Sequence, residues 1–343
     1  MSPRPPRDLR RAADLAALRE HRITRPGNAH MVIARELWSA FRALGFSSGR
    51  VLAGGEDAAT FLGLSPGQWP GGTSGTAAVG PDHAPGRPLT VHPGWKGPEE
   101  IDLAITSMPV NDVTLRDPSN IVARRADQVA LAILTVRGTR PGGLSTLLAS
   151  HDLMDDPVDI ARREIASMAE LVGAVRLPSG AHRHQPGTDL PTDLLLFRRR
   201  HPGEPQRGAN FETAPGINLD GARVTLNTYF DTRPDRMLGR ATYDPTSPPP
   251  TNLTLTGNRN RFAVELHAAF EQLTAEALRN DLTMTPATQA APSQGPRPNA
   301  VNDVDRYLSR GQRLRSGPAA YPGIGQTGWR GPSRDIDGPA SGL

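Results

Sequence analysis

Two turns in this sequence directly follow short apolar runs and carry groups that could meet a ligand. The first turn follows residues 50–53 and contains Gly55, where the absence of a Cβ lets the backbone come close to a bound molecule. The second follows residues 101–106 and begins with the hydroxyl of Ser107. If the two runs are parallel strands, both turns lie at the sheet edge where open α/β sheets bind ligands. They are the first candidates for a functional site.

Two other polar segments are better explained without a ligand. Residues 71–76 are rich in Gly, Ser and Thr and could hold a phosphate, but no lysine or helix start follows them, which favours a flexible linker. His182 and His184 lack partners at metal-ligand spacing, which favours a solvated loop. No metal site is predicted.

Composition narrows the class of protein. The 343 residues are enough for one large domain with appendages or for two ordinary domains. With 35 Gly and 34 Pro, much of the chain must be loop or tail. A net charge of +4 is only a weak indication of nucleic-acid binding. The absence of cysteine excludes disulfides and thiolate chemistry, and with no long apolar run it predicts a soluble, cytoplasmic protein that does not span a membrane.

Apolar periodicity predicts strands that alternate with helices. This alternation is typical of a doubly wound α/β sheet with mostly parallel strands. The last two strands are joined by a polar loop too short for a good helix, so they are expected to form an antiparallel edge. The expected helices cover residues 31–44, 127–137, 158–169 and 260–279, and the expected strands cover 50–53, 76–79, 101–106, 144–149, 171–177 and 192–198.

Three segments in order carry a resemblance to a known family. They are AsnAlaHis at 28–30 with the run to residue 63, IleAspLeuAlaIleThrSerMetProVal at 101–110, and the run from ThrArgProGlyGlyLeu at 139 to residue 200. Together they resemble the catalytic domain of the N6-adenine DNA methyltransferases, of the form found beside helicase-like modules in phage and plasmid proteins. The resemblance implies a Rossmann-like S-adenosylmethionine-dependent fold, a seven-stranded, mostly parallel sheet with an antiparallel edge, and strand 50–53 beside strand 101–106.

The same resemblance divides the chain into four parts. Residues 1–27 are expected to form a basic arm with a short helix, and residues 28–205 the methyltransferase-like domain. Residues 206–285 are expected to be an extension with one helix that packs on the domain. Residues 286–343 lack periodic apolar positions and are expected to be a disordered tail.

The residues that would bind S-adenosylmethionine are degenerate. The family has an acidic residue, a proline and a GxG motif in the first turn, whereas this chain keeps only Gly55 and carries Ala53 and Asp57 at other positions of that pattern. The carboxylate of Asp57 would face the carboxylate of the cofactor, so Asp57→Gly is expected to raise affinity. The acidic residue expected after the second strand is replaced by Gly80, and Asp82 is the substitute that the sequence offers.

The predicted catalytic turn is degenerate as well. The family pattern is Asn, any residue or Pro, Pro and an aromatic residue, and this chain has Ser107, Met108, Pro109 and Val110. Serine occurs at the first position in enzymes that methylate cytosine N4. Val110 removes the aromatic ring on which a flipped base would stack, a contact worth about 1–3 kcal/mol.

The sequence therefore predicts a DNA methyltransferase-like protein that is catalytically impaired, binds S-adenosylmethionine weakly or not at all, and acts as a DNA- or protein-binding module. The expected partners are DNA, with Arg198, Arg199 and Arg200 as phosphate contacts, and a protein such as a helicase-like module. The alternative is an active, divergent amino-methyltransferase acting on adenine N6 or cytosine N4. A third hypothesis is a decaying gene product without a role.

Overall fold

The computed structural model describes residues 26–55, 58–64, 68–69, 74–83, 89–93, 101–108, 118–181, 190–245, 252–258 and 260–286. The predicted basic arm up to residue 25, the tail from residue 287, and the predicted site residues Asp57, Pro109 and Val110 lie outside these ranges. So does the loop with His182 and His184.

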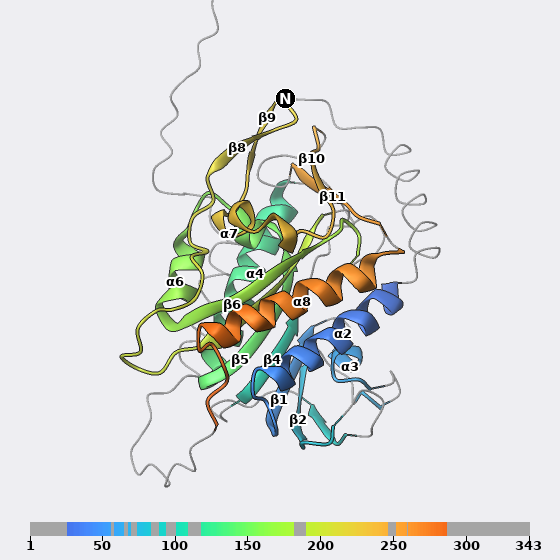
Figure 1. The fold of residues 1–343 in the computed structure, drawn as a ribbon, viewed down its shortest axis with the longest axis vertical. Coiled ribbons are helices and arrows are strands. Elements are labelled where there is room, and N and C mark those ends of the chain that lie inside the picture. Colours follow the sequence, from blue (N-terminus) through green and yellow to red (C-terminus); the bar gives the residue numbers. More distant parts are fainter. Residues whose placement is uncertain are drawn as a thin grey trace, which may run out of the picture.

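A seven-stranded sheet forms the centre of the molecule (Figure 1). Its order is β3-β2-β1-β4-β5-β7-β6, so the expected neighbours β1 and β4 lie side by side and parallel. β5 is parallel to β4 on the other side. The strands are β1 (Gly49–Gly55), β2 (Ser74–Val79), β3 (Val91–Pro93), β4 (Ile101–Ser107), β5 (Thr139–Ser150), β6 (Ala169–Leu177) and β7 (Thr192–Arg199).

Two strands, β2 and β7, run opposite to the other five. The reversal of β7 confirms the predicted antiparallel edge with β6. The reversal of β2 against β1 was not predicted. A parallel return needs a crossover of a dozen or more residues, usually a helix. The described residues between β1 and β2 form only the four-residue helix α3 (Ala58–Phe61), and β2 comes back along β1 in the opposite direction.

Two helical layers cover the two faces of the sheet. In Figure 1, α2 (Pro26–Ala43) and α8 (Phe262–Arg279) cross one face, and α4 (Pro118–Gly138) lies behind the sheet. Successive residues of β5 alternate between the two cores: Leu148 packs in the cluster that contains α2 and α8, and Leu147 in the cluster that contains α4 and α6 (Ile160–Met168). This period of two is that of a strand buried on both faces.

The C-terminal segment packs against this sheet. The predicted helix 260–279 is present as α8, which contacts α2 and β6 and buries Leu266, Phe270 and Leu273. Gly173 in β6 is the point of close approach, because a Cβ there would lie 2.4 Å from Leu273 Cγ. The remaining elements are α5 (Asp152–Asp155), α7 (Thr228–Thr232), a 3-10 helix (Pro234–Arg236), and the hairpins β8 (Gly216–Leu219) with β9 (Ala222–Thr225) and β10 (Arg240–Tyr243) with β11 (Leu253–Thr256).

Within the ranges given above, no helix combines the length and the apolar character that a bilayer crossing requires.

Candidate functional site

The two predicted turns meet at one edge of the sheet, which we call the carboxyl edge: the ends of β1, β4 and β5 at Gly55, Ser107 and Ser150. Gly55 and Ser107 are paired in register, and Ser107 is fully buried. Gly55 has φ +85°, and a Cβ on it would lie 1.6 Å from the carbonyl oxygen of Ser107. The glycine is therefore required by contact between two strands of the protein itself, and the buried Ala53 lies two residues before it in β1.

Asp82, the predicted substitute for the ribose-binding acid, lies at the opposite edge. We call this the amino edge, where β1, β4 and β5 begin. β2 ends at Val79, which pairs with Gly49 at the start of β1. The length of β1 therefore separates Asp82 from Gly55, roughly 20 Å at about 3.3 Å per residue. The structure therefore does not bring Asp82 and Gly55 together, and their cofactor-binding roles stay predictions.

Arg198, Arg199 and Arg200 also lie at the amino edge, and their guanidinium groups are bound within the fold. Arg198 pairs with Leu144 near the start of β5 and donates to Thr283 O at 2.7 Å and Glu204 Oε1 at 2.9 Å. Arg199 and Arg200 donate to carbonyl groups at the carboxyl ends of α4 and α6. The carboxyl end of a helix carries a partial negative charge, which stabilises a cation there. The DNA-binding role predicted for the three residues stays a prediction.

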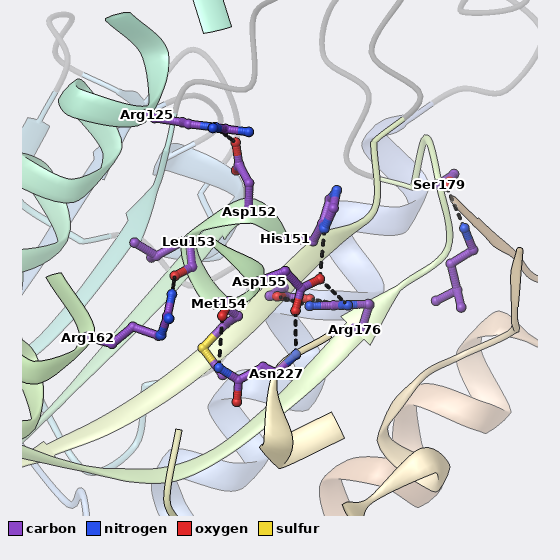
Figure 2. A network of polar contacts seen from close by, with 12 residues as sticks. Arg125, His151, Asp152, Leu153, Met154, Asp155, Arg162, Arg176, Ser179 and Asn227 are labelled. Carbon is purple, nitrogen blue, oxygen red and sulfur yellow. Dashed lines mark hydrogen bonds and ion pairs between the residues drawn. The ribbon is translucent and has the colours of Figure 1, made fainter. Parts of the chain in front are cut away.

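The carboxyl edge contains a buried polar network that was not predicted. We call it the His151 network: His151, Asp155, Arg176, Asp193 and Asn227, each with 0% exposure. Figure 2 labels His151, Asp155, Arg176 and Asn227. His151 Nδ1 lies 2.9 Å from Asp155 Oδ2, which also accepts from Arg176 Nη1 at 2.7 Å. Arg176 donates through Nε and Nη2 to the two oxygens of Asp193, at 2.7 and 2.9 Å. The backbone N–H of Asn227 donates to Asp155 Oδ1 at 2.8 Å.

Strand register and chain return bring these five residues together. Arg176 of β6 and Asp193 of β7 are direct cross-strand partners, and Asp193 pairs with Ala149 of β5 on its other side. His151 follows β5 at once, and Asp155 lies one helical turn later in α5. The guanidinium carbon of Arg176 stands 4.2 Å from the ring centre of Phe230, which adds a cation–π contact.

The electrostatics of the two carboxylates differ. Burial opposes ionisation of Asp155, but the Arg176 charge and the His151 hydrogen bond hold its pKa below the ordinary value. Burial raises the pKa of Asp193 above the ordinary value, against the attraction of Arg176. Breaking such a pair leaves an uncompensated buried charge. The network therefore depends on Arg176.

One atom of the His151 network is unused. Among the residues that the structure describes, His151 Nε2 has no hydrogen-bond partner, and neither has the neighbouring Ser150 Oγ. In Figure 2 the ring of His151 turns this nitrogen away from Asp155. A signal was present in the sequence, since Arg176 and Asp193 are charged residues directly beside apolar runs, and charged residues are rarely buried unless they pair.

The weak or absent binding of S-adenosylmethionine stays a prediction, because Asp57 lies outside the described residues. No group of three or more His, Asp or Glu side chains in the described ranges could hold a metal ion. The cofactor-binding expectation needs an acid after β2 beside Gly55, and Asp82 is at the other edge. The Cβ-free face of Gly55 is directed at the Ser107 carbonyl instead of open space.

Comparison with known proteins does not show a family for this chain. No protein-family model matches this chain, and no curated protein does. Among solved structures, the chain is similar to a chain from work on complex assembly and conformational transition of the type I R-M system, with 13% identity and a TM-score of 0.26. The match covers 64% of this chain and 44% of that chain, so the present chain spans less than half of its length. A likeness of this size does not place the protein in a family.

Proposed function

We propose that this chain is a methyltransferase-like protein that binds DNA without using S-adenosylmethionine. The fold supports the first part of the proposal: β1 and β4 are parallel neighbours, and the two turns of the family resemblance meet at one edge. The observation that carries the second part is the reversal of β2.

The reversed strand affects the cofactor site in a specific way. In the pattern that the resemblance implies, the turn after the second strand supplies an acid for the ribose hydroxyls. Here that turn lies beside Arg42, whose guanidinium donates to Gly80 O at 3.0 Å at the amino edge. A cofactor held near Gly55 would therefore lack this acid. Asp57 adds a like charge on the methionine side.

DNA binding is supported by where the charge lies in the sequence. Residues 1–27 contain seven arginines and three acidic residues, a net charge of +4 that equals the net charge of the whole chain. In contrast, the exposed Arg163 and Arg261 on the described surface each pair with a carboxylate one helical turn away. An unbalanced basic segment is the electrostatic footprint of phosphate binding. We therefore assign the phosphate contacts to residues 1–27 and not to Arg198–Arg200.

The cofactor part is tested by calorimetric titration of the full chain with S-adenosylmethionine, together with methyl transfer to mixed-sequence DNA. We expect no binding and no turnover. The Asp57→Gly variant separates the two causes: a gain of binding would identify the charge as the main obstacle, and no gain would identify the reversed β2.

The DNA part is tested by fluorescence anisotropy with a labelled mixed-sequence duplex over a range of salt concentrations. Replacing Arg4, Arg7, Arg10 and Arg11 with Gln should weaken binding, and should reduce the salt slope by roughly 0.9 for each arginine that contacts a phosphate. The matched control, Arg163→Gln with Arg261→Gln, removes exposed arginines that already have partners and should leave binding unchanged. Equal binding by the two variants would contradict the assignment.

A second candidate function is an active, divergent DNA amino-methyltransferase. One observation favours it: Ser107 lies buried at the end of β4, directly beside Gly55 at the carboxyl edge. Micromolar binding of S-adenosylmethionine together with turnover would establish this function and reject the first proposal.

A further inference from the structure

An open groove of about 300 Å³ lies between α2 and α8. The two helices lie side by side on one face of the sheet (Figure 1). Small and apolar side chains line much of the groove, namely Ser39, Ala40 and Ala43 of α2 and Phe270, Ala275 and Leu278 of α8. Leu278 is 47% exposed. Exposed apolar side chains gathered in a groove are typical of a contact surface.

The chain enters the fold at one end of this groove. α2 and α8 run in the same direction, because Glu36 bonds to His267 and, further along both helices, Ala43 and Leu278 line the same groove. α2 begins at Pro26, and the residues that precede it lie outside the described ranges. A segment that precedes Pro26 and turns back along α2 would therefore reach the groove.

Residues 8–21 have the length and the sequence pattern for this position. The sequence predicts a short helix here, and its apolar positions at a spacing of three and four share one face: Leu9, Ala12, Ala13 and Ala16. Residues 22–25 are a connection of ordinary length for two antiparallel helices. At about 1.5 Å per residue, a helix over residues 8–21 covers roughly 21 Å, which is the length of α2 from Pro26 to Ala40.

Charge agrees with this occupant at the rim of the groove. Glu36 and Glu271 are among the described residues that line it. On a helix, Arg10 and Arg19 flank the apolar face of residues 8–21, where long side chains can meet these carboxylates. Arg11 lies on the opposite side of the helix from Leu9 and would stay exposed.

We propose that residues 8–21 dock as a helix in the groove between α2 and α8, with Leu9, Ala13 and Ala16 directed into it. Docking fixes the basic segment on the fold and leaves Arg11 accessible to a phosphate. The inference goes beyond the proposed function, because docking does not require DNA and DNA binding does not require docking.

Cysteine labelling of the full chain tests the docking, because the sequence contains no cysteine of its own. Ala13→Cys places a thiol on the face that docks, and Leu18→Cys places one on the other side of the same helix. Each variant is alkylated with iodoacetamide, and its rate is divided by the rate of the same variant in urea, which removes differences in intrinsic thiol reactivity. We expect Ala13→Cys to react at least about tenfold more slowly than Leu18→Cys.

A second substitution tests whether the groove causes this protection. Ala275→Arg fills the groove from an exposed position of α8 and should raise the rate of Ala13→Cys to that of Leu18→Cys. The matched control is Gln272→Arg, at an exposed position of α8 that does not line the groove, and it should leave the protection unchanged.

Three results would overturn the proposal. Equal rates for the two thiols would show that residues 8–21 are not docked on this face. Protection that Ala275→Arg leaves unchanged would place them on another surface, and protection that is lost on dilution of the protein would mean that a second copy supplies the helix. The comparison of the two thiols decides even if Ala275→Arg does not fold.

Discussion

Buried charged side chains have different kinds of partners at the two edges of the sheet. At the amino edge, Arg198 is bound by Glu204 and by Thr283 and Thr285 from the segment after α8, and Arg140 binds Asp102 at 2.6 Å and Thr285 O at 2.7 Å. At the carboxyl edge, the equally buried charges of the His151 network pair with one another, because Arg176 binds both Asp155 and Asp193.

The two edges therefore use buried charged side chains for different contacts. The amino-edge arginines satisfy backbone carbonyls of a returning segment, which ties residues 283–285 to the sheet. At the carboxyl edge, similar ion pairs hold Asp155 in place, and Asp155 in turn orients the imidazole of His151.

The largest expected effect is at the carboxyl edge, in Arg176→Leu. Removing the guanidinium leaves Asp155 and Asp193 buried without their common partner, which should lower the free energy of unfolding by about 3–5 kcal/mol. Urea denaturation measures this. The control Arg163→Leu breaks an exposed ion pair with Asp159 and should change stability by less than about 1 kcal/mol. Similar losses in the two variants would remove the distinction between a buried and an exposed pair.

A second change at the carboxyl edge is Gly55→Ala. The new Cβ would collide with the Ser107 carbonyl, and alanine disfavours φ +85°, so the end of β1 must move away from β4. We expect a loss of about 2 kcal/mol or more. Gly80→Ala is the matched control, because a Cβ at Gly80 meets nothing within 4 Å. Thermal unfolding of both variants compares them, and an unchanged melting temperature for Gly55→Ala would show that the two turns are not held together.

At the amino edge, the pH dependence of Glu204 provides a smaller effect. Burial opposes its ionisation, but the His201 N–H and the Arg198 guanidinium lower its pKa to about 2, from an ordinary value of 4.5. A lowered pKa contributes stability that is present above pH 4.5 and is lost as the pH falls toward 2. Glu204→Gln should therefore flatten the dependence of stability on pH within that window. A variant as pH-sensitive as the wild type would mean that other carboxylates dominate.

The smallest effect is expected on the α2/α8 face, away from both edges. The hydrogen bond and charge of Glu36 raise the pKa of His267 above 6.5. A raised pKa contributes stability that is complete below pH 6.5 and is lost as the pH rises through the folded value. His267→Gln should remove a slight decline in stability above pH 6.5 and leave the acid side unchanged. A large effect would show that the pair of exposed His267 and buried Glu36 helps to hold α8 on α2.

The sequence alone indicated the central strands of the sheet and its antiparallel edge. The apolar runs at 50–53, 101–106 and 144–149 are present as parts of β1, β4 and β5, and β6 and β7 form the expected antiparallel edge. These predictions succeed because a local run of apolar residues indicates a buried strand. They also succeed because a short connection between two strands allows only an antiparallel pair. The family resemblance, and not local periodicity, implied that β1 lies beside β4, which places Gly55 beside Ser107.

Only the tertiary structure decided where charged side chains meet. The direction of β2 depends on a connection with weak local signals, and its reversal moves Asp82 to the amino edge. Arg198 takes partners from residues 283–285, more than eighty positions along the chain, and Asp155 meets Arg176 and Asn227 only because distant segments return to it. The partners in these pairs are far apart in the sequence and meet only when the chain is folded. A local sequence pattern therefore cannot predict them.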